Sequence, residues 1–131
     1  MDIQTEKLIV NAFIADRKKE RVLYELSKPD KREGCVLKLE HYIDTRFCVE
    51  IKEKISSCEQ VYDILKKYNS SQECYVLSVG EDDGKFMELS AALESCVFFG
   101  PFLISLVHGK VAYFEGEQSY GAPSRYLLIK D

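Results

Sequence analysis

The segment from Phe102 to Phe114 constrains the fold of this chain most strongly, because it has the pattern of a β-hairpin. Two runs rich in apolar, β-branched and aromatic residues, 102–107 and 110–114, are separated by His108 and Gly109. Two-residue hairpin turns need positive φ angles, which glycine adopts without steric cost. This spacing predicts a tight turn at His108-Gly109 between two antiparallel strands.

A two-residue turn also fixes the register of the hairpin. It sets three cross-strand pairs: Val107 with Lys110, Leu106 with Val111, and Ile104 with Tyr113. The alternation then places Leu103 and Phe114 on the face opposite to Tyr113. Both faces of the hairpin are therefore expected to be at least partly covered, with the Tyr113 face as the main core face.

The first helix is expected over residues 3–15, because apolar residues recur there at helical spacing. Its inward residues are predicted to be Ile3, Val10, Phe13 and Ile14. A charged stretch without glycine or proline follows. The helix either continues through this stretch or restarts with Asp16 as its N-cap, and it ends near Ser27.

Three further helices are predicted from helix-start signals and apolar stripes. Ser27-Lys28-Pro29-Asp30 is a helix-start sequence, with Ser27 as the expected N-cap and Pro29 in the first turn. Residues 56–60 hold two overlapping capping boxes, Ser56 with Glu59 and Ser57 with Gln60. The helices extend to about Tyr42, to about Tyr68 and, for the last one, from about Glu88 to Val97.

Strands are predicted at residues 46–51, 74–79 and 126–129, in addition to the hairpin, with an extended linker as the alternative for 46–51. The second of these is nearly continuously apolar, so we expect a central strand covered on both faces. The order of elements predicts a single α+β domain over residues 1–131. We expect N-terminal helices, then a mixed or mostly antiparallel sheet with a C-terminal hairpin, and helices packed on one side of it.

The composition is that of an ordinary globular protein. Of the 131 residues, 46% are hydrophobic and 31% are charged. No apolar run approaches the roughly 18 residues that a membrane span needs. The first six residues also lack the basic start and apolar core of a signal peptide. We therefore expect a cytoplasmic protein without membrane association.

The five cysteines agree with a cytoplasmic location. They are odd in number, and no two have the CxxC spacing of a zinc site. We expect all five to be small buried apolar side chains in a reducing compartment.

The charge is uneven along the chain. The net charge of the whole chain is −4. Residues 1–70 hold 14 basic and 13 acidic residues, whereas residues 71–131 hold 4 and 9. Within the first half, residues 17–32 carry seven basic and three acidic residues. The pattern predicts a dipolar molecule with a basic helical end and an acidic sheet end.

No catalytic or metal-binding motif stands out. The turn Glu81-Asp82-Asp83-Gly84 is acidic, but Lys85 and Phe86 interrupt the alternating ligands of a calcium loop. Asp44 follows His41 at i+3, which allows a pair but does not require catalysis, and His108 lies in the predicted turn. The chain also lacks a phosphate-binding loop. We therefore predict no catalytic residue, no metal site and no cofactor.

The candidate binding residues lie in two acidic segments. The loop from Glu115 to Arg125 contains tyrosine and arginine, which are common in binding hot spots. Equally, Tyr120 could pack on the sheet, and Arg125 could pair with Glu115 or Glu117. The candidates are Glu115, Glu117, Tyr120 and Arg125 in this loop, and Glu81, Asp82 and Asp83 in the acidic turn.

Three functions are compatible with these features. The leading hypothesis is a small acidic module that binds another protein with a basic surface. By analogy, inhibitors and bacterial immunity proteins that neutralise basic toxins are often small and acidic. The first alternative is an enzyme or small-ligand binder with a pocket between helix and sheet. The weaker alternative is nucleic-acid binding through residues 17–32, although the sequence pI of 5.3 disfavours it.

Overall fold

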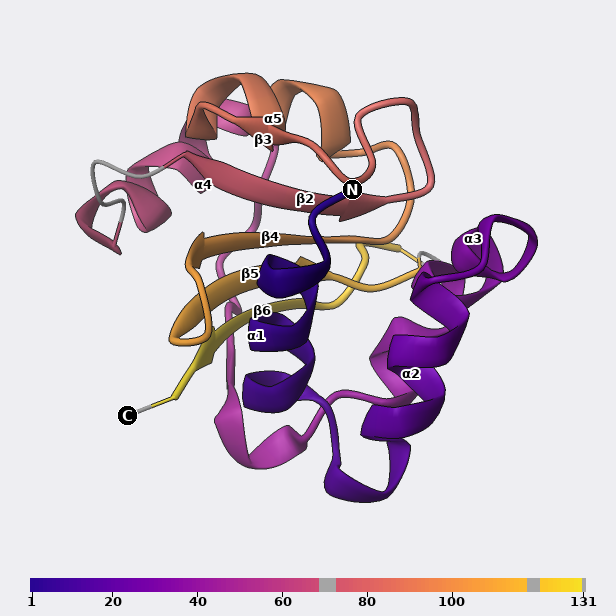
Figure 1. The fold of residues 1–131 in the computed structure, drawn as a ribbon. Coiled ribbons are helices and arrows are strands. Elements are labelled where there is room, and N and C mark those ends of the chain that lie inside the picture. The colour runs from indigo at the N-terminus through magenta and orange to yellow at the C-terminus, as the bar shows by residue number, and fades with distance from the viewer. Residues whose placement is uncertain (69–72, 118–120, 131) are drawn as a thin grey trace.

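The computed structural model describes residues 1–68, 73–117 and 121–130 (Figure 1). These residues form five α-helices and one six-stranded sheet, so the predicted α+β class is confirmed. The helices are α1 (Ile3–Phe13), α2 (Lys19–Leu26), α3 (Pro29–Leu37), α4 (Cys58–Leu65) and α5 (Leu89–Cys96). The strands are β1 (Cys48–Glu50), β2 (Cys74–Ser78), β3 (Phe86–Met87), β4 (Phe102–Val107), β5 (Val111–Glu115) and β6 (Arg125–Ile129).

The sheet has the strand order β1-β6-β5-β4-β2-β3, and all neighbouring strands are antiparallel. The predicted hairpin supplies β4 and β5, which lie at the centre. Every residue of β2 is buried, as its apolar run predicts. The two-residue strand β3 was not predicted, and it forms one edge of the sheet.

The hairpin register agrees with the prediction only away from the turn. Ile104 pairs with Tyr113, as predicted. The predicted partners of Val107 and Leu106 are wrong, because Val107 pairs with Val111 and the register shifts between Ser105 and Val107. Such a bulge adds one residue to a strand without changing which residues are apolar. The alternation of the sequence therefore does not reveal it.

The turn itself is a hydrogen-bonded reversal. The Lys110 N–H donates to the Val107 carbonyl at 2.8 Å, and Gly109 has a φ of +82°. A side-chain hydrogen bond also stabilises the turn, because His108 Nδ1 lies 2.7 Å from the hydroxyl of the buried Ser105.

Helices cover both faces of the sheet (Figure 1), which corrects the prediction of helices on one side. One core joins α1, α2 and α3 to the face that carries Leu103 and Phe114. The other joins α4 and α5 to the face that carries Ile104 and Tyr113. The apolar side chains on both faces of the hairpin are the physical reason, since each face needs a cover.

Several helix boundaries differ from the expected ones. The chain breaks after Phe13 and restarts as a short turn before α2, so the first helix does not continue. Ile3 was predicted to point inward, but it is exposed. Ser27 is not the N-cap of α3; that position is Lys28, and the Ser27 hydroxyl donates to the Tyr24 carbonyl at 2.6 Å. Of the two capping boxes predicted before α4, the one of Ser57 and Gln60 is present, and Ser57 rather than Ser56 is the N-cap.

No helix in the described part of the chain is long and apolar enough to span a bilayer.

Candidate functional site

A shallow acidic groove lies beside the C-terminal half of α5. Its volume is about 530 Å³. We name it the turn groove, because the turn between β2 and β3 forms one wall. Its lining residues are Gly80, Glu81, Asp82, Ala91, Glu94, Ser95 and Phe99. Two of the seven predicted binding residues, Glu81 and Asp82, are therefore brought together with a helix and an aromatic ring.

Hydrogen bonds fix the wall of the turn groove. The Ser95 hydroxyl on α5 donates to Asp82 Oδ2 at 2.6 Å, and Lys85 Nζ lies 3.1 Å from Asp82 Oδ1. The hydrogen bond from Ser95, and then that from Lys85, lower the pKa of Asp82 below its ordinary value. This carboxylate is therefore charged at neutral pH and held against the helix.

Two phenylalanines project beyond the end of α5. Phe98 is 52% exposed and Phe99 is 71% exposed, and Phe99 lines the turn groove. Phe98 has a φ of +72°, which is a left-handed conformation. This conformation is energetically unfavourable for every residue that has a Cβ atom. Strained residues of this kind often occur at functional sites. The chain thus holds two large apolar rings in solvent at the rim of an acidic surface.

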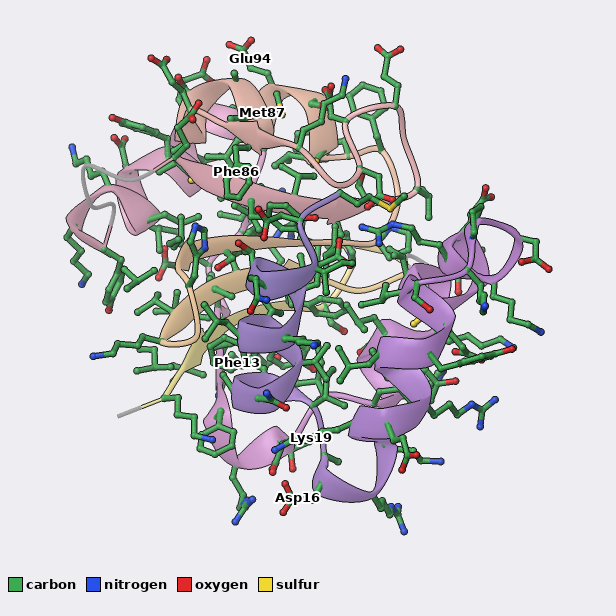
Figure 2. The ribbon with its side chains drawn as sticks, viewed as in Figure 1. Phe13, Asp16, Lys19, Phe86, Met87 and Glu94 are labelled. Carbon is green, nitrogen blue, oxygen red and sulfur yellow. The ribbon has the colours of Figure 1, made fainter. Side chains whose placement is uncertain are left out.

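A second groove lies between α4 and α5, and we name it the helix groove. It has a volume of about 190 Å³. Its lining residues are Cys58, Glu59, Tyr62, Asp63, Ser90, Leu93 and Glu94. Glu94 lines both grooves, and Figure 2 shows it pointing outward from α5. The two grooves are therefore neighbours on opposite sides of one carboxylate.

The two grooves together carry an excess of negative charge. Asp82 has Lys85 as its partner, and Asp63 lies 3.4 Å from Lys66. Among the described residues, no cation pairs with the other three carboxylates, which are Glu59, Glu81 and Glu94. The last turn of α5 also contains no basic residue to balance its negative dipole end.

The third acid of the predicted turn, Asp83, points into the molecule. Its carboxylate accepts from Arg32 Nε at 2.5 Å and from the Ser78 N–H at 3.0 Å. Asp83 therefore connects the turn to α3 and to the end of β2. Because Asp83 already forms an ion pair with Arg32, it is not available to bind a cation of a partner.

Glu115 and Arg125 were predicted to contact a partner, but both are buried, at 1% and 4% exposure. Arg125 Nε lies 3.3 Å from Glu115 Oε2, which also accepts from the Tyr113 hydroxyl at 2.6 Å. This is the pairing that the sequence offered as an alternative, and it leaves neither side chain on the surface. Glu117 is exposed. Tyr120 lies outside the described residues.

A different, mostly apolar groove of about 430 Å³ lies between α1 and α2. We name it the α1–α2 groove. Glu6 and Arg32 are among its lining residues, and every N–H group of the Arg32 guanidinium has an acceptor. Its five N–H groups donate to Glu6, Asp83 and the Leu26 carbonyl. The remaining lining residues are Met1, Ile3, Lys7, Leu23, Leu26 and Ser27.

The basic segment 17–32 is partly neutralised within the molecule. Arg32 is buried, Lys19 lies 2.8 Å from Asp16, and Arg21 lies 3.5 Å from Glu25. The surface is therefore less basic than the sequence indicates.

In the described segments, no group of three or more His, Cys, Asp or Glu side chains is placed to hold a metal ion. Burial lowers the pKa of His108, so this imidazole is neutral at neutral pH. Ser105 is completely buried, so its hydroxyl is not accessible as a nucleophile. Its hydrogen bond with His108 stabilises the hairpin turn.

Sequence reasoning missed most residues of the two grooves, among them Glu59, Tyr62, Asp63, Glu94 and Phe99, and it also missed the neighbouring Phe98. A local signal existed for the phenylalanines. They lie outside the apolar stripe of α5 and directly before the helix-breaking pair Gly100-Pro101. Glu94 and Tyr62 carried no such signal, because their importance depends on two helices packing side by side.

Comparisons of this chain with protein-family models, with curated proteins and with solved structures found no match. The chemistry of its own surface is therefore the basis for assigning a function.

Proposed function

We propose that this protein is a binding module that docks a basic segment of another protein on the turn groove. One observation carries the proposal: Phe99, 71% exposed, lies in the same groove as Glu81, Asp82 and Glu94. Large exposed apolar side chains bordered by polar residues mark interaction sites in soluble proteins.

The two kinds of side chain serve different parts of binding. The carboxylates attract a positively charged partner and raise its association rate. The ring of Phe99 offers an apolar contact and a face on which a lysine or arginine side chain can rest. The hydrogen bond between Ser95 and Asp82 holds the wall in place before binding, which lowers the entropy cost of association.

We favour one specific type of binding module: an inhibitor or immunity-type protein that neutralises a basic toxin or nuclease. The excess of acidic residues in the second half of the chain supports it, because a basic enzyme would be attracted to this side. We also propose a cytoplasmic location. The five cysteines are all free thiols, which supports a reducing compartment.

The test is calorimetric titration with a panel of short synthetic peptides rich in arginine, lysine and leucine. We expect binding that weakens with salt and that Phe99→Ala or Glu94→Lys reduces by about tenfold or more. The matched control is Glu33→Lys, which makes the same charge change at an exposed position of α3. The proposal fails if no peptide binds in a salt-sensitive way, or if the control weakens binding equally.

A second candidate, small-ligand binding, rests on the α1–α2 groove. Its volume of about 430 Å³ is within the range of ligand sites, and most of its wall is apolar. The probe is the fluorescent dye 1-anilinonaphthalene-8-sulfonate. Saturable fluorescence that Leu23→Lys abolishes would support this candidate, and its absence would count against it.

Nucleic-acid binding has less support, because Arg32 and two further cations of segment 17–32 are already paired. A gel shift with duplex DNA at low salt tests it.

A further inference from the structure

We propose that the partner places two cationic side chains on this protein, one in each groove, with Glu94 between them. This inference rests on the proposed function and specifies its partner. The first cation lies in the turn groove against Phe99, and the second lies in the helix groove against Tyr62. The occupant is thus a basic segment of another protein with two spaced lysine or arginine residues.

The position of Glu94 on α5 explains why it lines both grooves. Ser90 precedes it by four residues and lies in the helix groove, whereas Ala91 precedes it by three and lies in the turn groove. Residues at these spacings are neighbours on a helix surface. Glu94 therefore stands on the ridge that divides the two grooves, and its outward direction is visible in Figure 2.

The two grooves repeat the same chemistry. Each has one aromatic ring, Phe99 or Tyr62, and both rings are partly exposed. Each also has two acids of its own and shares Glu94. The pairs are Glu81 with Asp82 in the turn groove, and Glu59 with Asp63 in the helix groove.

The charge balance is also the same in both grooves. In each, one acid already has a lysine partner within the fold, as Asp82 has Lys85 and Asp63 has Lys66. The other acid, Glu81 or Glu59, has no ion-pair partner among the residues that the structure describes. Each groove can therefore accept one cation from outside.

A cation resting on an aromatic ring is an arrangement that this chain already uses elsewhere on its surface. Lys67 Nζ lies 5.2 Å from the centroid of the Tyr68 ring, and Lys28 Nζ lies 5.5 Å from that of Tyr24. Such contacts contribute about 0.5–1 kcal/mol at exposed sites. A carboxylate beside the ring adds charge attraction, so each groove favours lysine or arginine over a neutral side chain.

One cation cannot fill both grooves, because α5 separates them. A helix with its side chains is about 10 Å wide. A segment with a single basic residue would occupy one groove only, and the second groove would add nothing to its affinity. A segment with two suitably spaced basic residues would gain from both, since the second contact forms within the complex.

The test compares two peptides with each of four protein variants. The first is the tightest binder from the arginine, lysine and leucine panel, and in the second the cation distal to the Phe99 contact is replaced by glutamine. The variants are Phe99→Leu, Tyr62→Leu, Glu94→Gln and the control Tyr24→Leu. In the three leucine variants, leucine keeps an apolar side chain and removes the aromatic ring. Thermal unfolding checks that each variant is folded.

We expect Phe99→Leu and Glu94→Gln to weaken both peptides, and Tyr62→Leu to weaken only the first, by about fivefold. Tyr24→Leu should change neither. If Phe99→Leu weakens binding but Tyr62→Leu changes neither peptide, the two-cation inference is wrong and the proposed function stands. If neither variant changes the binding of any peptide, the proposed function itself is wrong.

Discussion

The guanidinium of Arg32 donates two parallel hydrogen bonds to the carboxylate of Glu6, with N–O distances of 2.9 and 2.5 Å. Both side chains are almost completely buried, at 6% and 7% exposure. Arg32 also donates to Asp83 at 2.5 Å, and the Tyr75 hydroxyl donates to Glu6 at 2.5 Å. This network joins α1, α3, β2 and the turn that forms the wall of the turn groove.

Replacing Arg32 by methionine should destabilise the protein by about 3–5 kcal/mol, because it leaves the carboxylates of Glu6 and Asp83 without their cation. Burial opposes the charge of Arg32, but its hydrogen bonds to Glu6 and Asp83 outweigh burial and raise its pKa. Urea denaturation of the two proteins measures the difference in the free energy of unfolding. Lys31→Met, at an exposed neighbouring position, is the control and should cost little. A loss for Arg32→Met below about 1 kcal/mol would contradict a structural role for the network.

The buried carboxyl of Glu115 should make part of the stability depend on pH. Burial raises its pKa above the ordinary value of 4.5, and the hydrogen bond from Tyr113 and the charge of Arg125 only partly offset this. A carboxyl with a raised pKa binds its proton more tightly in the folded state. Its contribution to stability is therefore present at low pH and is lost as the pH rises through the folded pKa.

Comparing the wild type with Glu115→Gln isolates this effect, because glutamine does not titrate. The stability of the wild type relative to the variant should fall as the pH rises from the ordinary pKa of a glutamate, 4.5, through the higher folded pKa of Glu115. The free energy of unfolding at several pH values measures it. A difference that is constant over this range would show that Glu115 has its ordinary pKa.

Much of the fold was predictable because it depends on local patterns. The hairpin, the apolar strand β2 and the capping box at Ser57 each have a signal within a few residues. The bulge before Val107 has no signal of this kind, and neither does the identity of the helices that cover the second face. A shift of one residue keeps the same apolar residues in the strand, and only the packing of α4 and α5 determines what covers the second face.

The candidate site was less predictable, because its residues are defined by contacts between distant segments. Arg32 and Asp83 are 51 residues apart, and no spacing rule connects them. The sequence marked the acidic turn as a whole, but it did not show that Asp83 points inward while Glu81 stays exposed. Burial by long-range packing likewise removed Glu115 from the surface.

Three of the five thiols should be unreactive in the folded protein, whereas the prediction that all five are buried is wrong for Cys48 and Cys58. Burial raises the pKa of Cys35 and Cys96 to about 12 and that of Cys74 to about 11. Since the thiolate is the reactive form, these three cysteines should resist iodoacetamide at mild alkaline pH until the protein unfolds. Cys48 and Cys58 are partly exposed and should react first. Mass spectrometry of peptides labelled with and without urea gives the order, and rapid native labelling of Cys96 would contradict its burial in the core between α5 and the sheet.

The left-handed conformation of Phe98 gives the last prediction. At a φ of +72° a Cβ atom is strained, whereas glycine is not. Phe98→Gly and Phe98→Ala both remove the ring, so the comparison between them isolates the strain. We expect the glycine variant to be more stable than the alanine variant by about 1 kcal/mol, the reverse of their order within a helix. Chemical denaturation measures this difference. If the alanine variant is equally or more stable, Phe98 is unstrained and the left-handed conformation no longer supports a functional role for the end of α5.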